Sequence, residues 1–331
     1  MPTASTPAQY ALILIDLAQG RGCDPRALVD GTTLADSGIA GMGARISDAD
    51  FARLAANALA LTGDPALGMQ LGLRLNLSAH ALLGQAFMTC RDLEQVMDLF
   101  MKFYHLLAPA LQLDFRIADD RCALTIVSSP TEIPREFSHE LVFAAVLNTL
   151  RGLLNKPDLP LRVELPYPPP GHSADYFEVF GPEVLFDCVE GRLSFPRALL
   201  ATPLPSSNPA LRALYEQECA RLLADLREED SVAEQTLRLL RKLEGQYPQM
   251  PQIAAMLNFS PRTYRRRLEE ENQSFQSLLD QVRAEHATRY LRNTRLPLSS
   301  IAYLLGFNDA SNFRRAFRKW TGRSPREVRN G

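Results

Sequence analysis

Two segments in the last quarter of the sequence carry arginine and small polar side chains at positions that share the outer face of a helix. The candidate contact residues are Arg262, Arg265, Arg266, Ser311, Asn312, Arg314, Arg315 and Arg318. Arginine can pair bidentately with guanine and asparagine with adenine in the major groove, while further basic residues bind phosphates. An arginine-rich helix face is often merely solvated. Two such faces, each after a short helix and a turn of three residues, favour binding to duplex DNA.

The elements that would position these side chains are two copies of a helix-turn-helix pattern. The first is a short helix 252–257, a turn 258–260 and a helix that begins at Pro261, a position where a helix start tolerates proline. The second is a helix 301–305, a turn 306–308 and a helix that turns Phe313 and Phe317 inward. Gly306 supplies the left-handed backbone conformation that a tight turn between helices needs.

A single helix, Phe275 to Arg292, is predicted between the two copies. At about 1.5 Å per residue it is roughly 27 Å long. Two recognition helices must lie about 34 Å apart to enter successive major grooves on one face of B-DNA. A rigid connector of this length, with the width of the flanking helices added, is of the right order. One chain could therefore address two adjacent half-sites without a partner.

The charge of the chain is divided between its two ends. Residues 231–331 hold 18 Lys and Arg against 9 Asp and Glu, whereas residues 1–230 hold 18 against 29, although the whole chain has a net charge of only −2. A basic module joined to an acidic one fits a polyanion binder attached to a domain that must not bind the polyanion. Two solvated surfaces of opposite sign would look the same, so charge alone leaves both interpretations open.

The remainder of the chain predicts an α+β domain and a connector. Helices are expected at 47–59, 93–107 and 136–154, a β-hairpin at 111–117 and 122–127, and short strands at 161–165, 184–186 and 192–195. The division is therefore an α+β domain at 1–205, a connector helix at 206–230 and a DNA-binding domain at 231–331. In the connector, Leu211, Leu214, Glu218, Leu222 and Asp225 form an imperfect coiled-coil stripe. It could help to form a dimer or could pack on its own domain.

Patterns typical of enzymes and metal sites are missing from the sequence. The histidines stand apart, with no HExxH spacing, no glycine-rich phosphate loop and no GxSxG turn, so no catalytic residue is assigned. The five scattered cysteines favour neither disulfides nor a thiolate metal site, and we expect no cofactor and no metal. His105 could in principle ligate a haem, but a structural histidine is expected. The apolar stretch 11–15 is too short for a signal peptide or a membrane span, which predicts a cytoplasmic, nucleoid-associated protein without a membrane partner.

An aromatic and methionine cluster in the first domain allows two interpretations. Its members are Phe87, Met88, Met97, Phe100, Met101 and Phe103. They could line a pocket for an apolar effector, but their helical spacing makes core packing the default expectation.

Residues from about 252 to 329 resemble the DNA-binding domain of the AraC/XylS family of transcription regulators. The segment 301–329, IAYLLGFNDASNFRRAFRKWTGRSPREVR, carries most of this resemblance and departs from the family pattern at Val328, where an aromatic residue is usual. We expect that departure only to soften local packing. The resemblance implies that Arg262, Arg265, Arg266, Ser311, Asn312 and Arg315 face bases. It also implies activation through recruitment of RNA polymerase.

The first domain is similar to the arabinose-binding-like N-terminal domain of a subset of that family, which includes regulators of ornithine use and of virulence. The matching stretches are 176–186, 193–195 and 200–205. The similarity does not imply arabinose as ligand, because a jelly-roll sugar pocket should show many short strands near the start, where this chain predicts helices.

Two functions remain open at this point. In the first, a small-molecule effector or dimerisation through the α+β domain controls a sequence-specific activator. In the second, the protein is a constitutive or architectural DNA binder whose first domain only oligomerises it. An effector-dependent change in thermal stability would favour the first.

Overall fold

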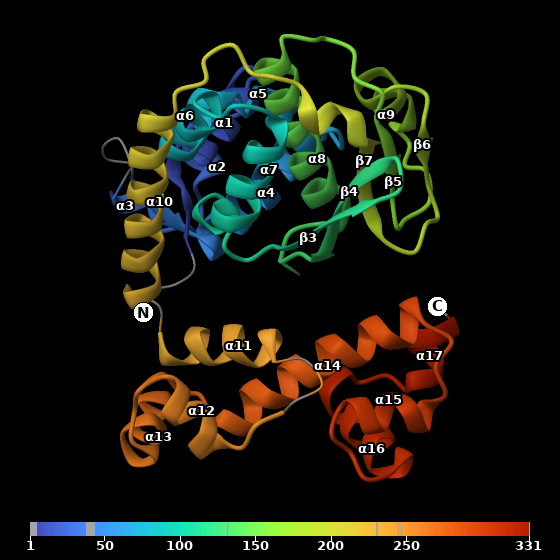
Figure 1. The fold of residues 1–331 in the computed structure, drawn as a ribbon. Helices are drawn as coiled ribbons and strands as arrows, with labels where there is room; N and C mark the ends of the chain where they lie inside the picture. Colours follow the sequence, from blue (N-terminus) through green and yellow to red (C-terminus); the bar gives the residue numbers. More distant parts are fainter. Residues whose placement is uncertain are drawn as a thin grey trace. The chain divides into compact units, whose positions relative to one another are not determined.

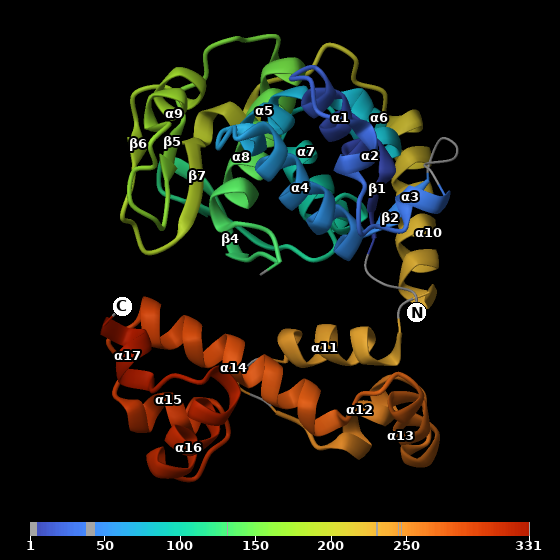
Figure 2. The same cartoon turned by 180° about the vertical axis from the view of Figure 1, so that it is seen from behind.

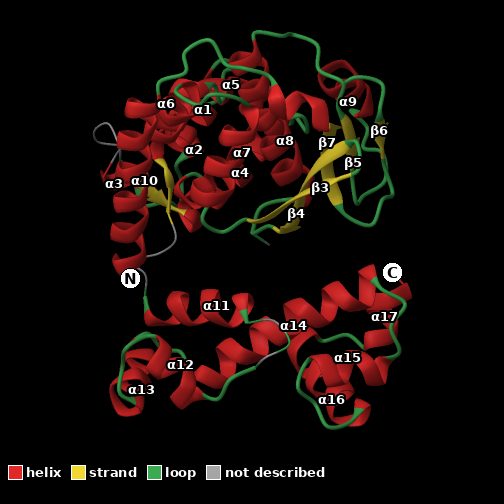
Figure 3. Cartoon of the chain, viewed as in Figure 1, coloured by secondary structure: helices red, strands yellow, loops and turns green. Residues whose placement is uncertain are grey.

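The computed structural model describes residues 5–37, 44–130, 132–229, 231–243, 245 and 247–330. The chain forms two compact units, Ala4–Asp225 and Leu226–Gly331 (Figure 1). The first contains helices and a sheet, and the second contains helices alone within its described residues (Figure 3). The predicted fold class, an α+β domain followed by an all-α domain with two helix-turn-helix units on a linker helix, is confirmed.

Several helices of the first unit begin where the sequence places a capping side chain. Ser47 accepts a hydrogen bond from the Asp50 amide at the start of one predicted helix, and Asp92 accepts one from the Gln95 amide at the start of another. The helices are α1 (Ala8–Gln19), α2 (Pro25–Leu28), α3 (Leu34–Ser37), α4 (Asp48–Thr62), α5 (Leu67–Arg74), α6 (Ala81–Met88), α7 (Leu93–Phe103), α8 (Arg135–Leu154), α9 (Ser173–Phe180) and α10 (Pro209–Glu229). Short 3-10 helices are η1 (Leu77–His80), η2 (Tyr104–Leu106) and η3 (Arg197–Ala201).

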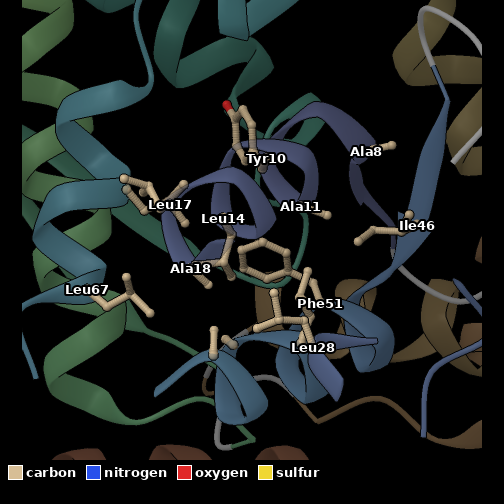
Figure 4. Close-up of a cluster of buried hydrophobic side chains, with 14 of the residues drawn as sticks. Ala8, Tyr10, Ala11, Leu14, Leu17, Ala18, Leu28, Ile46, Phe51 and Leu67 are labelled. Atoms are coloured by element: carbon tan, nitrogen blue, oxygen red, sulfur yellow. The ribbon is translucent and has the colours of Figure 1, made fainter. Parts of the chain in front are cut away.

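One face of helix α1 lies in the core of the first unit. Its side chains Ala11, Leu14 and Ala18 have no exposed surface and pack in one cluster with Phe51 of α4 and Leu67 of α5 (Figure 4). The apolar stretch noted near the start of the sequence is thus part of a core. In the described ranges, none of the helices combines the length and the apolar character that crossing a bilayer requires.

Helices α5 and α8 cross in direct contact because α5 carries two glycines at the crossing. A Cβ at Gly68 would lie 2.7 Å from the Phe137 carbonyl oxygen, and one at Gly72 would lie 2.6 Å from the Ala144 Cβ. Glu140 of α8 is buried nearby and accepts hydrogen bonds from the Tyr176 hydroxyl at 2.6 Å and the Met69 amide at 3.3 Å. Burial raises the pKa of the Glu140 carboxyl. In Figures 1 and 3, helix α8 lies between the other helices and the sheet.

The main sheet has five strands in the order β3-β4-β7-β5-β6. Its strands are β3 (Gln112–Ala118), β4 (Arg121–Ser128), β5 (Arg162–Glu164), β6 (Val184–Leu185) and β7 (Gly191–Pro196). All pairs are antiparallel except β5 with β6. The predicted hairpin is confirmed, with Ile117 paired to Cys122, and so are the three further strands. A second sheet, β1 (Ser5–Pro7) with β2 (Arg45–Ser47), was not predicted.

Helix α10 packs along one side on the first unit. Cys219 and Leu223 are buried, and Glu216 Oε1 lies 2.8 Å from Lys102 Nζ on α7. Leu211 and Leu214 of the predicted stripe are 42% and 59% exposed. The stripe therefore leaves an exposed apolar edge, and its role in forming a dimer stays a prediction.

Candidate nucleic-acid interface

The first helix-turn-helix unit is built from α12 (Met250–Met256) and α13 (Pro261–Glu270), with α11 (Val232–Lys242) packed beside them. The turn begins at Asn258, whose φ of 59° is left-handed. Ser260 caps α13 by accepting a hydrogen bond from the Thr263 amide at 3.1 Å. Tyr264 and Leu268 are buried in a cluster with Ile253 and Ala254 of α12. This core fixes which side of α13 points outward.

The second unit repeats this construction with α15 (Leu298–Leu304) and α16 (Ala310–Thr321), followed by α17 (Pro325–Asn330). Gly306 has a φ of 78°, as predicted. Asp309 caps α16 by accepting hydrogen bonds at 2.8 Å from the amides of Ser311 and Asn312. Phe313 and Phe317 are fully buried, in the places that Tyr264 and Leu268 occupy in the first unit.

One helix, α14 (Phe275–Asn293), joins the two units and contributes to both cores. Its first half supplies Leu278, Leu279 and Val282 to the first core, and its second half supplies Ala287 and Leu291 to the other. Its 19 residues span about 28 Å. In both views α13 and α16 lie toward the lower edge of this domain and α11 toward the upper edge (Figures 1 and 2).

The structure places all eight candidate contact residues on the exposed faces of α13 and α16. Helical periodicity puts Arg262 and Arg266 opposite the buried Tyr264 and Leu268. The same periodicity puts Ser311 and Arg315 opposite the buried Phe313 and Phe317, with Asn312, Arg314 and Arg318 at the flanks. The two helices therefore present related polar faces, with basic groups on each.

Some of these side chains already have partners within their own helix. Arg315 Nη2 donates to Asn312 Oδ1 at 2.6 Å, and Asn312 Nδ2 donates to Asp309 Oδ2 at 2.5 Å. Arg266 Nε lies 3.5 Å from Glu270 Oε1 in an exposed ion pair. By contrast, Arg262, Arg265 and Arg314 form no hydrogen bond or ion pair with any described part of the chain, so their guanidinium groups are available to a ligand.

Two family profiles cover most of the chain. Residues 22–204 match the profile described as the arabinose-binding domain of AraC transcription regulators, and residues 253–331 match a helix-turn-helix domain. A relative from Pseudomonas aeruginosa named ornithine utilization regulator is 39% identical over 98% of this chain and 96% of its own length. The chain belongs to the AraC family of transcription regulators.

Other relatives are more distant. The regulator VqsM of Pseudomonas aeruginosa is 26% identical over 80% of this chain and 83% of its own. A crystal structure of the regulator CdpR from Pseudomonas aeruginosa shares 26% identity, covers 81% of this chain and 87% of that one, and has a TM-score of 0.40. As an AraC-type regulator, the protein contains a helix-turn-helix DNA-binding domain, within which α13 and α16 both lie.

Sequence reasoning missed one residue that joins the two halves of this AraC-type domain. Arg283 projects from α14 between the ring of Tyr247, with 4.9 Å from guanidinium carbon to ring centroid, and the ring of Phe307 at 5.2 Å. Tyr247 precedes α12, whereas Phe307 lies in the turn of the second unit. A Cβ on Gly306 would lie 3.0 Å from Arg283 Nη2. Burial lowers the pKa of Arg283, whose Nε has no hydrogen-bond partner among the described residues.

We call this contact of Arg283, Tyr247 and Phe307 the arginine clamp. The signal in the sequence was the position of Arg283 on the predicted linker helix, four residues after Leu279 and four before Ala287, which places it on the same face as these two apolar residues. A second link, between Arg241 of α11 and Glu285, has donor–acceptor distances of 2.9 and 2.8 Å and holds α11 on α14.

Proposed function

We propose that this AraC-type regulator activates transcription by inserting α13 and α16 into two successive major grooves on one face of its operator. The observation that carries this proposal is the pair of exposed basic helix faces mounted on one continuous helix of about 28 Å. Adding the width of the flanking helices brings the separation toward the roughly 34 Å of one DNA turn.

The exposed residues divide into two proposed roles. Arg262, Arg265 and Arg266 on α13, with Ser311, Asn312 and Arg315 on α16, read base edges. Arg314 and Arg318 bind phosphates beside the second groove. The hydrogen bond between Arg315 and Asn312 supports a paired readout, because it orders two long polar side chains before they meet a base.

The direct test uses a duplex selected from a random library by the full-length protein. Dissociation constants are measured on that duplex and on a scrambled one for Arg265→Ala, Arg315→Ala and the control Lys242→Ala. Lys242 is exposed on α11 and its replacement removes the same charge. Each recognition variant should lose about 1–3 kcal/mol on the selected duplex, roughly 5- to 150-fold. Equal losses on both duplexes would mean contact with phosphates only.

We further propose that the first unit controls this activity, through a small-molecule effector, dimerisation or both, and that the bound protein recruits RNA polymerase. One relative is named an ornithine utilization regulator, so L-ornithine belongs in the first metabolite panel. The expected result is transcription in a purified system that rises with one metabolite and requires the intact operator. Operator occupancy and transcription that ignore every metabolite would favour the constitutive, architectural alternative. We also propose that the protein is located in the cytoplasm with the nucleoid, because its proposed operator is part of the chromosome.

Helix α7 supports effector control because it serves two purposes in the first unit. Val96, Met97 and Phe100 on one side of it line a pocket, and Lys102 pairs with Glu216 of α10. Helix α10 is the last helix before the DNA-binding unit in the chain. A ligand that displaces α7 would therefore act on the connector.

A further inference from the structure

The first unit contains a pocket of about 140 Å³ between α1, α4, α7, α8 and β3. Its walls are almost entirely hydrophobic side chains, among them Phe51, Phe87, Met97, Phe100 and Leu113. Val142 and Val146 of α8 remain half-buried although α8 lies between the helices and the sheet, because they face this space. A cavity of about 150 Å³ with apolar walls is known to stay dry and to bind benzene. The space therefore suits one aromatic ring or a branched aliphatic group.

Most polar groups in the pocket wall already have partners. The Tyr10 hydroxyl, which points away from the apolar cluster in Figure 4, lies 2.7 Å from His80 Nδ1, and His80 Nε2 lies 3.0 Å from Thr149 Oγ1. Thr6 donates to Asp48 Oδ1 at 2.8 Å. Groups satisfied in this way have little to offer a strongly polar ligand.

Ser138 is the exception. Its side chain is only 5% exposed, it lines the pocket, and its hydroxyl forms no hydrogen bond with the described part of the chain. A hydroxyl can both donate and accept, so Ser138 can hold one oxygen of a ligand.

The charges of the wall disfavour ionic ligands of either sign. Asp48 already accepts a hydrogen bond from Thr6 and interacts with the nearby charge of Arg45, so it has little to offer a cation. None of the described residues that line the pocket is Lys or Arg, and Asp48 supplies a carboxylate. A ligand carboxylate would lose its hydration without gaining a cationic partner, and it would also meet the charge of Asp48. This holds for fatty acids and for amino acids alike.

We propose that the pocket binds a small neutral molecule with an apolar body of about one ring and a single oxygen that hydrogen-bonds to Ser138. The inference rests on the proposed effector control and names the chemical class of the effector.

The test compares three probes that share one carbon skeleton and differ in charge at about pH 7.5, namely benzyl alcohol, benzoate and benzylamine. Binding to the full-length protein is measured by thermal shift and by ligand-observed NMR. Benzyl alcohol should bind and raise the melting temperature, because a ligand that prefers the folded state stabilises it. Benzoate and benzylamine should produce no shift.

Two variants locate the site. Val142→Phe should fill the pocket and abolish the benzyl alcohol shift, whereas Val189→Phe, at a position 67% exposed, is the matched control and should keep it. Ser138→Ala should weaken benzyl alcohol roughly 2- to 12-fold and leave toluene unchanged. This second variant keeps the test decisive if Val142→Phe fails to fold.

The assignment would be overturned if benzoate or benzylamine bound more strongly than benzyl alcohol, or if none of the three probes bound. Neither outcome would contradict the proposed DNA binding. Equal effects of Val142→Phe and Val189→Phe would also overturn it. Binding at the pocket that leaves operator affinity and transcription unchanged would confirm the ligand class and refute effector control, so the two proposals fail in different ways.

Discussion

Replacement of Arg283 by alanine tests whether the two helix-turn-helix units bind DNA as one rigid body. The substitution removes both ring contacts of the arginine clamp, at 4.9 and 5.2 Å. Each half-buried contact of this type contributes about 1 kcal/mol. Part of that loss is offset, because the substitution also removes a buried Nε that has no partner among the described residues. The net cost should be about 1–2 kcal/mol.

That cost should appear mainly in binding that needs both units at once. A rigid link between two binding modules makes the second contact intramolecular, and this advantage depends on correct orientation. If the clamp holds the productive orientation by about 1–2 kcal/mol, its loss should weaken binding to a two-half-site duplex roughly 5- to 30-fold. Binding to a duplex with one half-site should change less than about 2-fold, because neither recognition helix is touched.

The assay measures fluorescence anisotropy of labelled one-site and two-site duplexes with Arg283→Ala, Arg283→Lys and the exposed control Lys242→Ala. Lysine keeps the charge but lacks the planar group that stacks between two rings, so Arg283→Lys should resemble the alanine variant. Trp320 is the single tryptophan of the chain and lies 5.7 Å from the Phe307 ring, so its emission reports folding of the second unit. Equal losses on both duplexes, or a lysine variant that binds like the wild type, would refute orientation by stacking.

Three further predictions follow from charge, backbone and burial. If Arg314, Arg318 and one to four further basic side chains of the DNA-binding unit bind phosphates, the slope of log K against log salt should be about −3 to −5. A titration between roughly 50 and 200 mM salt in which the affinity hardly changes would contradict this. Gly306→Ala should lower the free energy of unfolding of the DNA-binding unit by at least about 1 kcal/mol, because alanine is strained at a φ of 78° and its Cβ would lie 3.0 Å from Arg283 Nη2. Urea unfolding monitored by Trp320 fluorescence measures this change, and an unchanged midpoint would argue against the turn geometry. Burial lowers the pKa of His80 to about 4, below its value in the unfolded chain. The free energy of unfolding should therefore fall by up to roughly 3 kcal/mol as the pH drops from about 6.5 toward 4. Calorimetry should show a flatter pH dependence of stability for His80→Gln, and identical profiles for the variant and the wild type would refute the prediction.

Local signals in the sequence predicted the elements well where a single residue type dictates the backbone. The alternation before and after Ala118–Arg121 predicted the hairpin, and Gly306 predicted the left-handed turn of the second unit. In the first unit, Asn258 adopts the same left-handed conformation in place of a glycine. Asparagine tolerates this conformation, but its presence in a sequence does not predict it. The strands β1 and β2, which were not predicted, have three residues each, too few for a periodic pattern.

Tertiary arrangements were less predictable because periodicity gives the buried face of a helix and not what lies opposite it. Of the aromatic and methionine cluster expected to be core, Phe87, Met97 and Phe100 line the pocket, whereas Phe103 is fully buried. The sequence could not show that the side of α8 facing α7 leaves space for a pocket. The same limit applies to Arg283, since its two ring partners are 36 residues before it and 24 after it in the chain.

The contacts of α10 limit how a pocket ligand can influence the connector. The Lys102–Glu216 ion pair joins side chains that are 57% and 26% exposed. Surface pairs of this kind contribute at most about 1 kcal/mol, so breaking this pair would change the position of α10 only weakly. The backbone is more firmly tied, because the Asn208 amide donates to the Thr89 carbonyl at 3.0 Å, just before α7 begins. Movement of α7 should therefore carry the start of α10 with it as one body. Since a ligand shifts an equilibrium only by its difference in affinity for the two positions, a tenfold preference corresponds to about 1.4 kcal/mol of control over α10.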